Sequence, residues 1–107
     1  MATPLILSAA TVDDVRVWRA PDHTRLVFDL SESVKYKIVP LTSPDRLIID
    51  IQDTTLGVQT TKLDFSLMPI SSLRSSTMGK NNLRIVLDLK KPLYPKAFIL
   101  GPNEQYS

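Results

Sequence analysis

One six-residue phrase occurs three times in this chain of 107 residues, and it restricts the fold more than any other feature of the sequence. The copies are RLVFDL at 25–30, RLIIDI at 46–51 and RIVLDL at 84–89. Each copy reads arginine, apolar, β-branched, apolar, aspartate, apolar. Because side chains alternate between the two faces of a strand, each copy predicts a β-strand with one fully apolar face and one face that carries Arg and Asp.

The phrase belongs to a longer repeat. The first and third copies are 59 residues apart, since 84 − 25 = 59. The same offset aligns Lys37 with Lys96, and a gap of one residue aligns Arg16 with Arg74. We therefore expect a single domain over 1–107, with one repeat unit at about 12–53, a spacer at 54–69 and a second unit at about 70–107.

Four further segments alternate and are bounded by turn residues, which is typical of strands. These predicted strands are 15–19, 34–41, 70–77 and 94–100, and the spacer is expected to hold one short helical turn at 63–67. The second copy of the phrase follows the first by 21 residues, and 84 + 21 = 105, where the chain reads Gln105-Tyr106-Ser107. The last strand of the second unit is therefore predicted to be truncated or missing.

These strands predict an all-β protein. If each unit forms one four-stranded antiparallel sheet, the two apolar faces bury each other best, which gives a β-sandwich of two pseudo-symmetric sheets. A closed barrel of the same strands is the alternative. A truncated final strand would leave an unpaired edge, through which a dimer can form.

Composition excludes several classes of function. A net charge of +2 with acidic and basic residues interspersed argues against nucleic acid as a partner. The chain has no cysteine, hence no disulfide and no thiolate metal site, and it has no apolar run of the roughly 20 residues that a membrane span needs. No signal peptide is visible at its start.

Catalytic chemistry is also not predicted. His23 is the only histidine and is expected to be a solvated turn residue, whereas catalytic zinc sites commonly use more than one His. The glycines at 57, 79 and 101 are too far apart for a phosphate-binding loop. We therefore predict no catalytic residue, no metal site and no cofactor in this chain.

Several motifs together resemble the AMIN domain. They are VRVW at 15–18, APDHTRLVFDLS at 20–31, VKYKIVPLTSPDRLIIDI at 34–51, SLRSS at 72–76 and LRIVLDL at 83–89. The resemblance covers roughly residues 12–102. It is weakest at the C-terminus, where the fourth phrase is absent.

This resemblance implies a function that composition does not. AMIN domains precede the catalytic domain of bacterial N-acetylmuramoyl-L-alanine amidases and also occur in type IV pilus secretins. A similar role would make this chain a periplasmic, non-enzymatic module that binds peptidoglycan and directs an amidase to the division septum for daughter-cell separation, with division-septum proteins as further partners. The zinc ligands of such an amidase would lie outside this chain. The alternative is a peptidoglycan-binding or protein-interaction domain of a pilus secretin.

The Arg and Asp faces allow two interpretations. They can form exposed cross-strand ion pairs, or their guanidinium groups can bind carboxylates of peptidoglycan. Trp18 can be a platform for a sugar ring or can simply cover the edge of the sandwich. The six candidate ligand-binding residues are Arg16, Trp18, Arg25, Arg46, Arg74 and Arg84.

Overall fold

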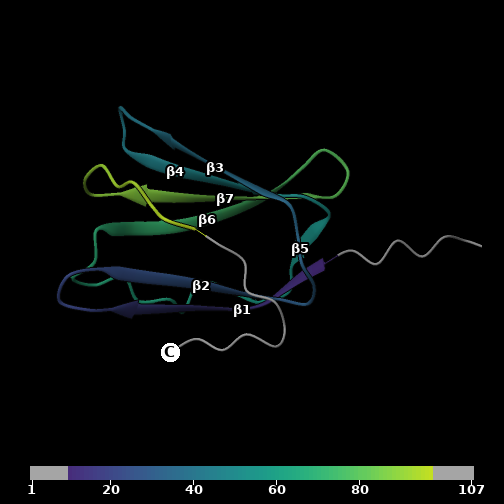
Figure 1. Cartoon of the computed structure of the whole chain (residues 1–107), viewed down its shortest axis with the longest axis horizontal. Helices are drawn as coiled ribbons and strands as arrows, with labels where there is room; N and C mark the ends of the chain where they lie inside the picture. Colours follow the sequence, from purple (N-terminus) through teal and green to yellow (C-terminus); the bar gives the residue numbers. More distant parts are fainter. Residues whose placement is uncertain (1–9, 98–107) are drawn as a thin grey trace, which may run out of the picture.

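The computed structural model describes residues 10–97, which form seven strands and no helix. The strands are β1 (Ala10–Arg19), β2 (Thr24–Leu30), β3 (Tyr36–Leu41), β4 (Arg46–Ile51), β5 (Thr54–Leu56), β6 (Ile70–Met78) and β7 (Asn82–Leu89). They form a three-stranded sheet in the order β2-β1-β5 and a four-stranded sheet in the order β3-β4-β7-β6 (Figure 1). The predicted all-β sandwich is confirmed, and each copy of the phrase lies in a strand: β2, β4 and β7.

The core lies between the two sheets. Its buried side chains come from β1, β4, β6 and β7: Val12, Val15, Leu47, Ile49, Ile51, Ile70, Leu83, Ile85 and Leu87. In β4 the apolar positions of the phrase are buried, while Arg46, Ile48 and Asp50 between them are only half-buried. The face assignment made from the alternation is therefore correct for this strand, and the Arg and Asp side chains point away from the core.

The expectation that each repeat unit forms its own sheet is wrong. The hairpin β1–β2 lies in the three-stranded sheet, whereas β3 and β4 of the same unit lie in the four-stranded sheet, where β4 pairs with β7 of the second unit. In Figure 1, β3, β4, β7 and β6 occupy the upper part of the molecule, and β1 and β2 the lower part. The pairing of β4 with β7 places two copies of the phrase side by side. Through this pairing, β3 and β4 lie in a different sheet from β1 and β2 of the same unit.

The duplication itself is visible in the two hairpins β1–β2 and β6–β7. Arg16 lies opposite Val27 in the first, and Arg74 lies opposite Val86 in the second. Both hairpins have an irregularity at the same place, between Val12 and Asp14 in β1 and between Ile70 and Ser72 in β6. The hairpins are therefore structural repeats down to the position of the bulge.

Three local expectations also differ from the structure. The spacer contains β5, which pairs in parallel with β1 over Ala10–Val12, and the predicted helical turn at 63–67 is an irregular turn instead. Residues 94–97 of the predicted strand at 94–100 are not a strand, and 98–107, including the expected truncated strand, lie outside the described residues. In the first unit, the residues equivalent to 94–97 overlap β3, which is a strand because it pairs with β4. No described strand stands in the place of β4 beside 94–97, so their backbone groups have no ladder to join.

Candidate functional site: the outer faces of the two sheets

The six candidate residues do not come together in one site. Arg16, Trp18 and Arg25 lie on β1 and β2, on the outer face of the three-stranded sheet. The other three, Arg46, Arg74 and Arg84, lie on the outer face of the four-stranded sheet. Because the sheets bury their inner faces against each other, these two outer faces point away from one another. We call them the Trp18 face and the four-strand face.

The Trp18 face is built around one guanidinium group. The Nη2 atom of Arg16 donates a hydrogen bond of 2.7 Å to Asp29 Oδ1 across the hairpin, and its Cζ atom lies 5.1 Å from the centre of the Trp18 ring. This geometry is a cation–π contact on an exposed surface. Trp18 is 47% exposed, and Arg25 is its cross-strand neighbour. The face therefore offers an exposed aromatic ring that is held in place by a salt-bridged arginine.

The four-strand face consists of three rows of side chains that run across its strands. The register places Lys37, Asp50, Arg84 and Ser76 in the first row, Val39, Ile48, Val86 and Arg74 in the second, and Leu41, Arg46, Asp88 and Ser72 in the third. The second row forms a half-buried apolar stripe that ends at Arg74. The three rows together carry four cations and two carboxylates. The face thus has an excess of two positive charges around an apolar centre.

Two of the arginines on the four-strand face form bidentate ion pairs. Arg84 donates from Nε and Nη2 to the two oxygens of Asp50, at 2.8 and 2.9 Å. Arg74 does the same to Asp88, also at 2.8 and 2.9 Å, and the hydroxyl of Ser72 donates to Asp88 at 2.6 Å. These hydrogen bonds favour the ionised carboxylates and hold the pKa of Asp50 and of Asp88 below the ordinary aspartate value.

Arg46 differs from these two arginines. Its Nε atom donates to the Pro44 carbonyl at 3.2 Å, and it forms no ion pair within residues 10–97, although it lies opposite Asp88. The Asp88 oxygens are engaged by Arg74 and Ser72 instead. The guanidinium of Arg46 is therefore the one on the four-strand face with the most donor capacity left for a ligand.

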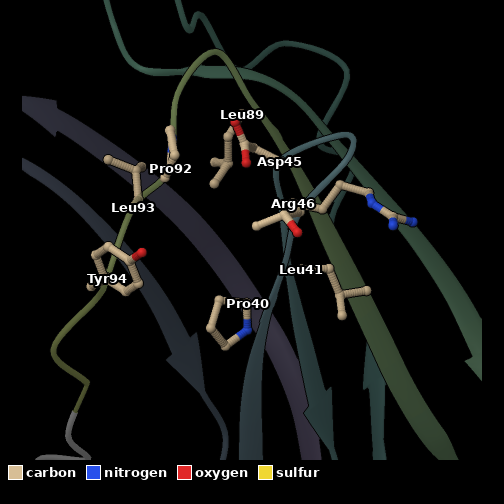
Figure 2. Close-up of a pocket in the computed structure, with 9 residues that line it drawn as sticks. Pro40, Leu41, Asp45, Arg46, Leu89, Pro92, Leu93 and Tyr94 are labelled. Carbon is tan, nitrogen blue, oxygen red and sulfur yellow. The ribbon is translucent and has the colours of Figure 1, made fainter.

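A shallow depression lies beside Arg46 at the end of the four-stranded sheet (Figure 2). Pro40, Leu93 and Tyr94 lie on one side of β3 and β4, while the guanidinium of Arg46 points to the other side, as does Leu41. The depression has a volume of only about 20 Å³, little more than one water molecule occupies. This depression is too small for a sugar or a peptide.

A catalytic centre is not visible in the described part of the chain. His23 is exposed in the β1–β2 turn, and its Nδ1 atom lies 2.7 Å from Asp22 Oδ1. No group of three or more His, Cys, Asp or Glu side chains within 10–97 could hold a metal ion. The same residues contain no helix that could cross a bilayer.

Sequence reasoning missed two members of the four-strand face. Lys37 is not among the six candidate residues, but it lies on the edge strand β3 opposite Asp50, in the first row. Ser72 was not considered, and it bonds to Asp88. The alternation showed that Lys37 points outward, but only the strand order reveals which carboxylate it faces.

Comparison with known proteins assigns the family. Residues 14–106 match the AMIN domain family, which is almost the whole chain. The chain belongs to the AMIN domain family. The AMIN domain described here is 31% identical over 91 residues to the N-acetylmuramoyl-L-alanine amidase AmiC of Neisseria meningitidis serogroup B. It is 29% identical over 101 residues to the amidase of the same name from Escherichia coli O6:H1.

These alignments cover 81% and 91% of the AMIN domain but only 22% and 24% of the two amidases. The AMIN domain thus spans about a quarter of the length of the curated relatives that it matches. The resemblance inferred from the repeated phrase is confirmed. The rest of each amidase lies outside the aligned region.

Proposed function

We propose that this AMIN domain is a non-catalytic module that binds peptidoglycan and directs an N-acetylmuramoyl-L-alanine amidase to the division septum, where the amidase separates daughter cells. The observation that carries this proposal is the four-strand face, which has four cations, two carboxylates and an apolar row on an exposed sheet surface. A flat surface of this kind suits an extended polymer better than an enclosed small molecule.

The chemistry of peptidoglycan complements the four-strand face. Its stem peptides carry carboxylates, which the planar guanidinium of Arg46 and the ammonium of Lys37 can bind. Its sugar rings and alanine methyl groups can lie on the apolar row of Val39, Ile48 and Val86, which crosses the sheet between the two cations. Arg74 and Arg84 already hold aspartates, so they keep the face rigid rather than supply the first contact.

The Trp18 face provides a second contact of different character. Its exposed ring can support one face of a sugar, and Arg16 beside it can donate to the oxygens at the sugar rim. Because the two faces point in opposite directions, one domain can contact two neighbouring strands of the polymer. Weak contacts on a repetitive polymer add through effective concentration, so modest affinity at each face is sufficient.

The setting and the parent protein belong to the same proposal. Peptidoglycan of the septum lies in the periplasm, and we place the domain there, with division-septum proteins as its further partners. Both relatives reported above are amidases, which favours an amidase over a pilus secretin as the parent. Zinc would be needed only by the catalytic domain of that parent, and this domain itself would use no cofactor.

Sedimentation with purified sacculi tests the role of the four-strand face. The double variant Lys37→Gln/Arg46→Gln removes two cations, neither of which forms an ion pair in the described residues, so it should fold normally and lose most of its binding. Lys62→Gln, in an exposed turn outside the strands, removes a cation elsewhere and should sediment as the wild type does. Because exposed charges are screened over about 10 Å at 0.1 M salt, binding should also fall as salt is added.

Each outcome has a clear meaning. If the wild type stays in the supernatant, the binding role is wrong. If the wild type and the double variant sediment equally while Trp18→Ala does not, the domain binds peptidoglycan through the Trp18 face instead. Circular dichroism of each variant checks that the β-structure is retained.

A further inference from the structure

Lys37 is one of two cations on the four-strand face that form no ion pair within residues 10–97. It lies on β3 opposite Asp50 on β4, and Asp50 in turn lies opposite Arg84 on β7. Both oxygens of Asp50 accept hydrogen bonds from Arg84, at 2.8 and 2.9 Å. The exposed ammonium of Lys37 therefore faces a carboxylate that another cation already neutralises, and its three donors can serve a ligand.

Arg46 repeats this arrangement in the third row. It lies opposite Asp88, whose oxygens accept hydrogen bonds from Arg74 at 2.8 and 2.9 Å and from Ser72 at 2.6 Å. In both rows a cation thus faces an aspartate that a different arginine holds. Two cations and one carboxylate leave one positive charge in each group. The excess charge of the four-strand face is therefore concentrated at two places rather than spread evenly over the sheet.

The half-buried apolar row lies between these two places. The partner of Lys37 on β4 is Asp50, four residues along the strand from Arg46, so the Cα atoms of the two cations are about 13 Å apart along the strands at about 3.3 Å per residue. Across the strands they are one spacing of about 4.8 Å apart. An extended peptide rises by the same distance per residue. Anionic groups about four residues apart on such a peptide would therefore match the two cations, and small side chains between them would lie on the apolar row.

We propose that the four-strand face is a two-point site for an extended peptide with two free carboxylates about four residues apart, one bound by Lys37 and the other by Arg46. This inference rests on the proposed binding of peptidoglycan and adds a specificity to it. A stem peptide with a free carboxyl terminus can occupy both points. A stem peptide whose terminal carboxylate has become the amide of a cross-link loses one of them.

Two isomeric peptides test the spacing. Acetyl-Glu-Ala-Ala-Ala-Ala has its side-chain carboxylate and its terminal carboxylate four residues apart, whereas acetyl-Ala-Ala-Ala-Ala-Glu carries both on one residue. The two peptides have the same composition and the same charge. In an NMR titration of the whole chain, the first peptide should bind about fivefold more tightly than the second and than its own carboxyl-terminal amide, which is what one favourable exposed ion pair contributes.

Single variants then assign the two points. Lys37→Gln and Arg46→Gln should each remove most of the fivefold preference, because either change leaves one cation of the pair. Lys62→Gln, which removes a cation from an exposed turn outside the strands, should keep the preference. Circular dichroism checks that each variant retains its β-structure.

Sedimentation with sacculi separates failure of this inference from failure of the proposed function. If the wild type sediments but binds the two isomers equally, the domain binds peptidoglycan and the two-point specificity is wrong. Absence of binding to either isomer at millimolar concentration would also overturn the two-point site. A preference that survives both Lys37→Gln and Arg46→Gln would show that other residues make it, which contradicts the assignment.

Discussion

The difference in burial between the two repeats leads to a quantitative prediction. Ile85 on β7 and Leu26 on β2 hold equivalent positions, but Ile85 is fully buried and Leu26 is half-buried. Truncation of each to alanine removes three carbon atoms from the same kind of site. The loss of stability should therefore depend on the neighbouring strand rather than on the chemistry of the side chain.

The magnitudes follow from burial. At about 0.8 kcal/mol per buried methylene, Ile85→Ala loses roughly 2.4 kcal/mol of transfer free energy, and the enclosed cavity brings the total to about 3–4 kcal/mol. Leu26→Ala loses about half of the transfer term and leaves no enclosed cavity, so we expect about 1–1.5 kcal/mol. A domain of ordinary stability, about 5–15 kcal/mol, remains folded with either change.

Urea denaturation measures both losses. With a slope of about 2 kcal/mol per M, the midpoint should fall by roughly 1.5–2 M for Ile85→Ala and by about 0.5–0.7 M for Leu26→Ala. Equal losses would contradict this prediction. They would mean that the side chain of Leu26 is as well covered as that of Ile85.

Two further predictions concern the ion pairs and one turn. Hydrogen bonds from Arg84 and Arg74 hold the pKa of Asp50 and of Asp88 below 3.8 in the folded state. As the pH falls, the unfolded chain therefore takes up protons before the folded chain does. These carboxylates stabilise the fold above about pH 5, and this stabilisation is lost as the pH falls through and below 3.8. Urea midpoints measured from pH 6 to pH 2 should fall less steeply for Asp50→Asn, and an unchanged slope would contradict the assignment. Gly79, with φ +63°, lies in the β6–β7 turn, so Gly79→Ala should cost about 1 kcal/mol, while Gly79→Asn should cost less because Asn tolerates this conformation. Thermal unfolding compares the two, and equal melting temperatures would argue against strain at this turn.

The alternation of apolar and polar residues within short segments was sufficient to predict much of this fold. The alternation in the three phrases identified β2, β4 and β7 and assigned their inner faces, and Ile49 and Leu87 are buried as that assignment requires. The offset of 59 residues, with a gap of one residue, identified the two equivalent hairpins and aligned Arg16 with Arg74. These features depend on side chains that are close in sequence, where a period of two is unambiguous.

Less of the candidate site could be predicted from the sequence. Arg25, Arg46 and Arg84 lie on the polar faces that the alternation predicts, but the chain does not say which strands become neighbours. Consequently it does not say that Lys37 faces Asp50, that Arg46 remains without an ion pair in the described residues, or that Trp18 and Arg84 lie on opposite sides of the molecule. The short parallel strand β5 was missed because three residues carry too little pattern.

Residue patterns alone specified most of the strands, their buried sides and the repetition of one charged phrase. Tertiary structure decided which copies of that phrase meet: β4 and β7 pair, and β2 is left in the other sheet with one edge open among the described residues. The physical reason is that all three copies satisfy the same local rules and are complementary to one another. Only the long-range assembly of the sheets, through a shared apolar core, selects which pair forms.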